Sequence, residues 1–257
     1  MKTAAIICEY NPFHNGHRYL IEKALSEHGF DRVICIMSGN YVQRGEPAVI
    51  DKYTRAEWAL RAGAEAVIEI PPVFATSSAR EFAACAVHLA DSLGIVNGLV
   101  FGTEGNISLS ELTETAEKLK DSENEKRIGE LTALGLSYPE ALTKAGFFPE
   151  KLSSNNILAM EYLRSLSEIS GKILPVPVKR TGDPYSACRP SDHTYTSATA
   201  IRNMFHSGTS DPDAFLPDFV REKLTGIVHP DMLSPLLTRA ILDADDLTVY
   251  QDVSAEI

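Results

Sequence analysis

The chain has 257 residues, 44% of them hydrophobic and 23% charged, so it is long enough to bury a sizeable core and is neither disordered nor fibrous. With 35 acidic and 24 basic residues its net charge is -11, which disfavours general binding to nucleic acid, so any RNA contact must be local or carried elsewhere. The four cysteines form no C-x-x-C pair, which indicates neither a zinc site nor a disulfide partner and fits a reducing cytoplasm.

Four short apolar runs predict the strands of a parallel sheet. They are β-branched and nearly unbroken, as in strands covered on both faces, and they span residues 3–8, 32–37, 66–70 and 98–101. The first run is too short for a signal peptide or a membrane span, so we expect no export and no membrane partner. Helical patterns that close on glycine lie between the runs, at 16–29, 51–63 and 78–94. This alternation predicts an α/β fold, a Rossmann-like open parallel sheet with helices on both faces.

The second half of the chain predicts additions to this sheet. Residues 109–136 are charged and helical, which indicates a solvated insertion outside the sheet. Further patterns predict a helix at 153–168, a proline-bearing edge strand at 172–180 and a short helix at 196–205, followed by small helices. We therefore expect one domain over residues 1–207, with a helical insertion at about 108–150, and a helical C-terminal segment over 208–257.

The loop "EYNPFHNGH" follows the first strand and leads into the first helix. Free N–H groups and the helix dipole at such a helix start favour an anion, and Gly16 lets a ligand approach the backbone. His14 and His17 could then meet one polyphosphate from adjacent positions. The spacing alone leaves three interpretations open: polar groups on a turn, nucleotide binding, or a metal site.

A second candidate is "TSATAIR", where Ser197 and Thr199 stand at a helix start and Arg202 follows one turn later. By itself this pattern is equally that of a capped helix with a surface arginine. Together with the first loop it offers two helix N-termini and three cationic or polarisable side chains to a single triphosphate, and this pairing favours nucleotide binding.

Other positions fit the same site, each with an ordinary structural alternative. Gly102 could approach a base or ribose, Asn155 and Asn156 could read hydroxyls or a base edge, and Arg180 could stack on a base or pair with phosphate. The long loop at 38–56 is typical of a lid or binding loop, and it carries Gln43, Arg44, Asp51, Lys52 and Arg55. Two helix stripes are assigned to the core: Trp58, Leu60 and Ala62, and Phe82, Val87 and Leu89.

As a set, these motifs resemble a known family. "HNGH" resembles the H-x-G-H signature of the nucleotidyltransferase superfamily, and "SATAIR" its second signature. The longer stretches "EYNPFHNGH", "GNYVQRGEPAVIDK", "VFGTE" and "SSNNILAMEYL" resemble the bacterial tRNA(Met) cytidine acetate ligase family over nearly the whole chain. The resemblance implies an HxGH nucleotidyltransferase fold and a two-step reaction: acetate and ATP give acetyl-adenylate, and the acetyl group passes to the exocyclic amine of the wobble cytidine of elongator tRNA(Met).

The resemblance also implies roles for residues. His14, His17 and Arg202 would be catalytic, ATP would be a substrate accompanied by Mg²⁺, acetate and elongator tRNA(Met) would be partners, and no protein metal site is expected. The implied ATP site consists of Ile7, Cys8, Glu9, Tyr10, Asn11, Pro12, Phe13, His14, Asn15, Gly16, His17, Leu20, Gly102, Asn155, Asn156, Arg180, Ser197, Thr199 and Arg202.

Members of that family continue past the position of Ile257, into a region expected to help hold the tRNA. The resemblance therefore supports adenylation in this chain more firmly than transfer to tRNA. Two other functions remain open from the sequence. One is a nucleotidyltransferase acting on a phosphorylated metabolite, whose second phosphate Arg44 and Lys52 would hold; the other is a non-catalytic ATP-binding or RNA-binding module.

Overall fold

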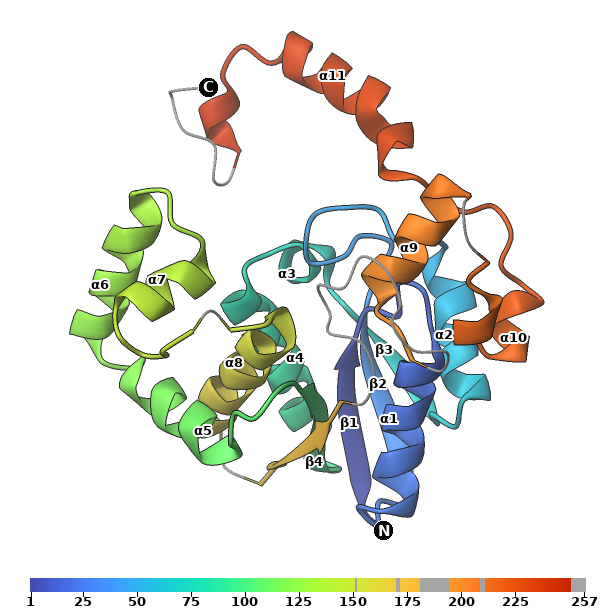
Figure 1. The fold of residues 1–257 in the computed structure, drawn as a ribbon, viewed down its shortest axis with the longest axis horizontal. Coiled ribbons are helices and arrows are strands. Elements are labelled where there is room, and N and C mark those ends of the chain that lie inside the picture. Colours follow the sequence, from blue (N-terminus) through green and yellow to red (C-terminus); the bar gives the residue numbers. More distant parts are fainter. Residues whose placement is uncertain (151, 170–171, 181–194, 209–210, 251–257) are drawn as a thin grey trace.

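The structure, a computed structural model, describes residues 1–150, 152–169, 172–180, 195–208 and 211–250. One sheet of five parallel strands lies at its centre, with the strand order β3-β2-β1-β4-β5 (Figure 1). The strands are β1 (Thr3–Cys8), β2 (Arg32–Ser38), β3 (Ala66–Ile70), β4 (Val96–Thr103) and β5 (Leu174–Lys179). All five predicted strands are confirmed, and the proline-bearing β5 lies at an edge, where a missing N–H breaks no ladder.

The strand order fixes where a ligand can bind. The chain passes from β1 to β2 on one side and later adds β4 on the other side of β1, so the strand order reverses between β1 and β4. In open parallel sheets, the crevice outside the carboxyl ends of the strands at such a reversal is the usual ligand site. Cys8 ends β1, and the predicted histidine loop follows it directly into this crevice.

Helices cover both faces of the sheet, as the sequence predicts. Successive residues of β1 point to opposite faces, so Ala4 and Ile6 belong to one buried cluster and Ala5 to another. The first face carries α1 (Asn15–Ser26), α2 (Lys52–Arg61), α9 (Ala198–Ser207) and α10 (Asp218–Arg221). The second face carries α3 (Pro72–Ala75), α4 (Ala79–Ser92), α5 (Leu109–Lys118) and α8 (Ser154–Glu168) (Figure 1).

The insertion after β4 is more than the solvated run expected from its charges. It folds into α5, α6 (Ser122–Ala133) and α7 (Tyr138–Lys144), and the apolar side of α5 packs into the core beside α8, burying Leu112, Ala116 and Leu119. The many charged residues belong to the solvent face of the helix, and a short apolar stripe on the opposite face is easily missed in such a sequence.

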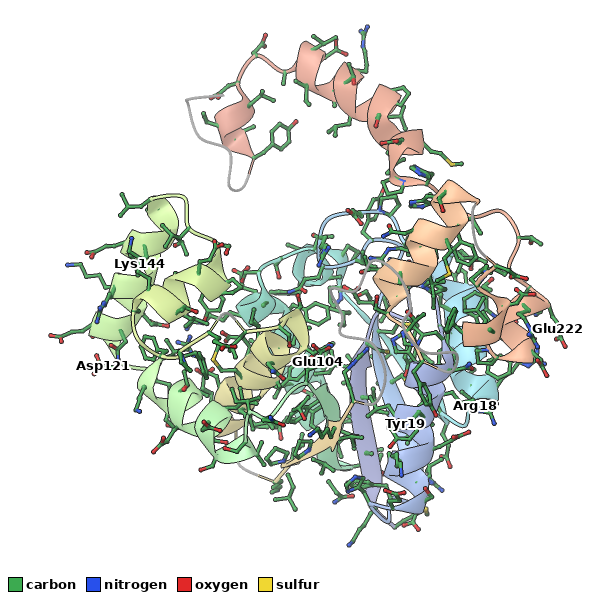
Figure 2. The ribbon with its side chains drawn as sticks, in the orientation of Figure 1. Arg18, Tyr19, Glu104, Asp121, Lys144 and Glu222 are labelled. Atoms are coloured by element: carbon green, nitrogen blue, oxygen red, sulfur yellow. The ribbon has the colours of Figure 1, made fainter. Side chains whose placement is uncertain are left out.

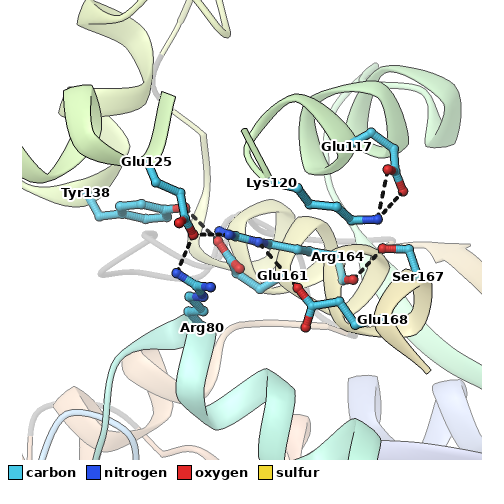
Figure 3. A network of polar contacts seen from close by, with 9 residues as sticks. All are labelled: Arg80, Glu117, Lys120, Glu125, Tyr138, Glu161, Arg164, Ser167 and Glu168. Carbon is cyan, nitrogen blue, oxygen red and sulfur yellow. Dashed lines mark hydrogen bonds and ion pairs between the residues drawn. The ribbon is translucent and has the colours of Figure 1, made fainter. Parts of the chain in front are cut away.

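A partly buried polar network joins this insertion to α4 and α8 (Figure 3). The Glu125 carboxylate pairs with Arg164, whose side chain is only 6% exposed, and with Arg80 at 2.5 Å. The Tyr138 hydroxyl donates to Glu161 at 2.6 Å, and burial raises the pKa of the Glu161 carboxyl. Because a buried charge without its partner is costly, this network fixes the insertion at one place on the domain.

The chain beyond α9 continues in short helices, namely η1 (Asp213–Phe215), α10, η2 (Pro230–Leu233), α11 (Ser234–Asp243) and η3 (Leu247–Val249). Phe215 and Val220 pack into the core, whereas α11 leads away from the body of the domain (Figure 1). The division of the chain at residue 207 stays a prediction. Among the residues that the structure describes, no helix is long and apolar enough to cross a membrane.

Two assignments from the sequence need correction on α2. Leu60, assigned to the core with Trp58, is 46% exposed, because the helix turns this side toward solvent. Arg55, considered as a loop-side charge, is completely buried: its guanidinium donates to the carbonyl oxygens of Ile50 at 3.1 Å and Ser38 at 3.2 Å, and also contacts those of Glu9 and Gly39. Arg55 thus ties the ends of β1 and β2 to the long loop that follows β2.

Replacing Arg55 by lysine is expected to lower the free energy of unfolding by about 2 kcal/mol, because an ammonium group cannot reach the carbonyls that the guanidinium holds. Urea unfolding measures this change. Arg61→Lys is the matched control: Arg61 lies on the same helix, 40% exposed and paired with Glu222, and a change within about 0.5 kcal/mol is expected there. Equal losses in the two variants would contradict the assigned role of Arg55.

Candidate active site

A cavity of about 210 Å³ opens at the carboxyl ends of β1, β4 and β5. Its walls come from the loop between β1 and α1, the loop after β2, the start of α8 and the start of α9. The cavity therefore lies at the reversal of strand order, with three helix N-termini, those of α1, α8 and α9, in its walls. Such N-termini present free N–H groups and favour anions.

The two histidines are arranged by the start of α1. His14 is the N-cap, and its Nδ1 accepts a hydrogen bond from the Gly16 N–H at 3.0 Å. His17 Nδ1 accepts from the His14 N–H at 3.3 Å, and the two rings stack with their centroids 3.7 Å apart. Because Nδ1 is the acceptor in both rings, each neutral imidazole carries its proton on Nε2. The pair thus offers two Nε2–H donors in fixed orientations.

Both imidazoles are neutral at pH 7. Burial, together with the nearby charge of Arg180, lowers the pKa of His17 to about 3. Burial and the neighbouring His17, Arg180 and Arg202 hold the pKa of His14 well below its ordinary value. These side chains can therefore donate to an anion without adding a buried positive charge of their own.

The depressed pKa values predict a pH dependence of stability. The unfolded chain protonates His17 near pH 6.5 and the folded chain only near pH 3, so the unfolded state binds more protons between these values. Above about pH 6.5, His17 is neutral in both states and does not lower the free energy of unfolding. As the pH falls below this value, protonation of His17 in the unfolded chain stabilises that state, and the folded protein loses stability. Below about pH 6, the free energy of unfolding should decrease more steeply with falling pH in the wild type than in His17→Asn. We expect the two slopes to differ by about 1 kcal/mol per pH unit.

Urea unfolding of both proteins at pH 6, 5 and 4 measures this difference. Asparagine keeps an acceptor for the His14 N–H and removes the titrating imidazole. Parallel curves for the two proteins would show that His17 is not held neutral by the fold.

The second predicted motif lies against the first. Arg202 Nη1 donates to the carbonyl oxygen of Asn11 at 2.8 Å, and Nη2 donates to Thr199 Oγ1 at 3.1 Å. The Ser197 hydroxyl caps α9 by accepting from the Ala200 N–H at 3.0 Å. Two segments nearly two hundred residues apart in the chain therefore share one cavity, as the pairing of the motifs predicts.

The far wall of the cavity joins β4, β5 and α8. A Cβ on Gly102 would lie 3.1 Å from Arg180 Cγ, so a larger residue there would require the arginine to shift by a few tenths of an ångström. Asn155 faces the cavity, whereas Asn156 turns toward the backbone of Glu104: its Oδ1 accepts from the Glu104 N–H at 2.9 Å and its Nδ2 donates to the Glu104 carbonyl oxygen at 2.9 Å. The two adjacent amides therefore have different roles: Asn155 lines the cavity, and Asn156 binds the backbone of Glu104.

The long loop after β2 is tied to the histidine loop. The Gln43 N–H donates to Glu9 Oε1 at 2.9 Å, and the Val49 N–H donates to Asn11 Oδ1 at 2.7 Å. Gln43 and Arg44 line the cavity. Lys52 instead pairs with Glu69 at 2.6 Å and does not belong to the cavity lining, so a second phosphate pocket formed by Arg44 and Lys52 stays a prediction.

Most of the predicted site residues are brought together in the cavity lining: Ile7, Cys8, Glu9, Tyr10, Asn11, His14, Gly16, His17, Leu20, Gly102, Asn155, Arg180 and Arg202. Six lie outside that lining: Pro12, Phe13, Asn15, Asn156, Ser197 and Thr199. Phe13 is buried in the core and the Asn15 amide donates to the Ala214 carbonyl oxygen at 3.1 Å, so contacts outside the cavity occupy these two side chains. The role of each residue in binding stays a prediction.

The lining also contains residues that the sequence did not single out as site residues: Ile6, Tyr19, Phe82, Phe101, Ser154, Leu158, Tyr162, Val178, Lys179, Tyr195, Thr196 and Ala198. Phe82, assigned to the core alone, is buried and also faces the cavity. One usable signal was present, since Ser154, Leu158 and Tyr162 recur every four residues and share a face of α8.

The family model for the HIGH nucleotidyl transferase matches residues 1–257. The chain belongs to the HIGH nucleotidyl transferase family. Similar family members include a tRNA(Met) cytidine acetate ligase of a Thermoanaerobacter species, 42% identical over 235 residues that make up 87% of this chain and 58% of that protein. Another is that of Clostridium tetani, 40% identical over the whole of this chain and 69% of that protein. The resemblance to the tRNA(Met) cytidine acetate ligase family is thereby confirmed.

Solved structures of this HIGH nucleotidyl transferase family agree with the fold. Thermotoga maritima TmcAL bound with alpha-thio ATP has a TM-score of 0.78 and 35% identity, over 94% of this chain and 61% of that one. The apo form of the same protein has a TM-score of 0.75 and 36% identity, over 94% of this chain and 57% of that one. The chain thus spans 58% of the length of the Thermoanaerobacter relative and 57% to 61% of the TmcAL chains.

Proposed function

We propose that this chain binds ATP in the cavity between the α1 and α9 N-termini and joins acetate to its α-phosphate. The observation that carries the proposal is the contact between Arg202 Nη1 and the Asn11 carbonyl oxygen, which places the guanidinium and the histidine pair around one cavity. The ligase names of the relatives and the bound alpha-thio ATP in a neighbour of the same fold support the same assignment.

In the proposed first step, an acetate oxygen attacks the α-phosphorus of ATP. A new bond forms between oxygen and phosphorus, the bond to the bridging oxygen breaks, and pyrophosphate leaves with the electron pair of that bond. The products are acetyl-adenylate and pyrophosphate. In the second step the exocyclic amine of the wobble cytidine of elongator tRNA(Met) attacks the acetyl carbonyl, AMP leaves, and the amine loses a proton.

The protein needs only to orient the reactants and to stabilise charge that grows on the departing pyrophosphate. The Nε2–H groups of His14 and His17 and the guanidinium of Arg202 are the donors we assign to this role, with the α1 and α9 N-termini beside them. Neutral imidazoles suit it because they are already oriented by their Nδ1 hydrogen bonds and need no reorganisation during the step.

Mg²⁺ is proposed to enter with the triphosphate. In the part of the chain that the structure describes, no three His, Cys, Asp or Glu side chains group as metal ligands. Magnesium often keeps several waters and binds through substrate phosphates, so it suits a site without a protein cage. When bound, the ion would neutralise part of the triphosphate charge.

The test is acetate-dependent exchange of labelled pyrophosphate into ATP. Exchange that requires acetate supports the proposal, whereas normal ATP binding without exchange would reject acetate as the acceptor. Phosphorylated metabolites in the same assay test the other nucleotidyltransferase chemistry. Acetylation of cytidine in elongator tRNA(Met) tests the second step. For a chain with this coverage of its relatives and this net charge, the second step remains a proposal. A cytoplasmic location is likewise a proposal.

A further inference from the structure

Glu104 follows β4 and lies beside the cavity without lining it. Figure 2 shows it near the centre of the domain, between the start of α8 and the strands. Its backbone is held on both sides by the Asn156 amide, with two hydrogen bonds of 2.9 Å. Its side chain is only 13% exposed, so this carboxylate has a fixed position and little access to solvent.

One oxygen of this carboxylate meets two residues of the cavity wall. Oε1 accepts a hydrogen bond from Asn155 Nδ2 and lies 3.3 Å from Arg180 Nε. Asn155 belongs to α8 and Arg180 follows β5, and both side chains face the cavity. We propose that Glu104 is a positioning residue, whose carboxylate orients Asn155 and Arg180 for the nucleotide; this inference rests on the proposed function.

A carboxylate is required here for a physical reason. A single ionised oxygen can accept from an amide and from a guanidinium together, and charge-assisted hydrogen bonds are roughly twice as strong as neutral ones. The Arg180 N–H also donates to the Thr103 carbonyl oxygen at 2.9 Å, so backbone and side chain both tie the end of β5 to the end of β4. Arg180 in turn contributes to the low pKa of both histidines, which links Glu104 to the opposite wall.

The experiment is a double-mutant cycle in which the ATP dissociation constant is measured for each variant. ATP is titrated into the wild type, Glu104→Gln, the variant Asn155→Ala with Arg180→Met, and the triple variant. Glu104→Gln is expected to raise the ATP dissociation constant about tenfold. In the background that lacks both partners, the same change should alter it less than about twofold, because nothing remains for the carboxylate to orient.

Glu117→Gln is the matched control, since it removes a half-exposed carboxylate of α5 that pairs with Lys120, away from the cavity. It should bind ATP as the wild type does. Glu104→Asp keeps the charge on a shorter side chain and should give an intermediate affinity; it decides the question if Glu104→Gln fails to fold. Wild-type affinity in Glu104→Gln, or an equal tenfold loss in the background without both partners, overturns the inference. A wild type that binds no ATP overturns the proposed function and the inference with it.

Discussion

Replacing His17 with alanine is expected to slow acetyl-adenylate formation by about 10²–10³-fold, with the ATP dissociation constant changed less than about threefold. The loss falls on turnover because the Nε2–H of His17 is assigned to charge that develops as pyrophosphate leaves. A donor that acts mainly in the transition state lowers kcat more than it weakens ground-state binding. Acetate-dependent pyrophosphate exchange at saturating ATP measures the rate.

Two variants separate this effect from a general disturbance. His17→Asn keeps an acceptor for the His14 N–H but lacks the Nε2 donor, so it should lose nearly as much activity as the alanine variant. His88→Ala, at an exposed histidine of α4, should keep wild-type turnover. Unchanged turnover in His17→Ala, or wild-type turnover in His17→Asn, would remove His17 from the catalytic step.

Arg202→Lys is expected to lower kcat/KM for ATP by about 10²-fold. Lysine retains the charge, yet it cannot contact the Asn11 carbonyl oxygen and Thr199 Oγ1 together while facing the cavity, as the planar guanidinium does. Steady-state kinetics with ATP varied at saturating acetate provide the measurement. Both kcat and KM should change, because the link between the two walls is lost along with the donor.

Arg239→Lys provides the comparison for this change, since Arg239 is 77% exposed on α11 and pairs with Asp243 in its own helix. We expect wild-type kinetics from it. A lysine at position 202 that supports full activity would show that positive charge alone suffices there, and the bidentate role would be wrong.

The sequence predicts the sheet well because local pattern and global fold agree along it. The strand bounds follow from unbroken β-branched runs, and Gly29, Gly63 and Gly94 follow their helices with φ of 66°, 111° and 68°. The meeting of the two motifs that are predicted to bind phosphate also follows, because parallel strands bring their carboxyl ends to one edge.

The parts that sequence could not supply depend on contacts between distant residues. Arg55 reads as one more charge near a helix start, and only the fold reveals the buried carbonyls that it meets. The sequence cannot show that Asn155 and Asn156 have different roles, because the role of Asn156 depends on its hydrogen bonds to the backbone of Glu104. Glu104 itself reads as an ordinary loop carboxylate after β4, since its partners come from α8 and β5.

The central claim is that one triphosphate is held at once by the histidine loop and the start of α9. A crystal structure with a non-hydrolysable ATP analogue tests it most directly. The account predicts phosphate oxygens within hydrogen-bond distance of Nε2 of His14 or His17 and, on the same nucleotide, of Arg202 or the α9 N-terminus. A nucleotide bound to only one of the two segments, or elsewhere on the molecule, would contradict it.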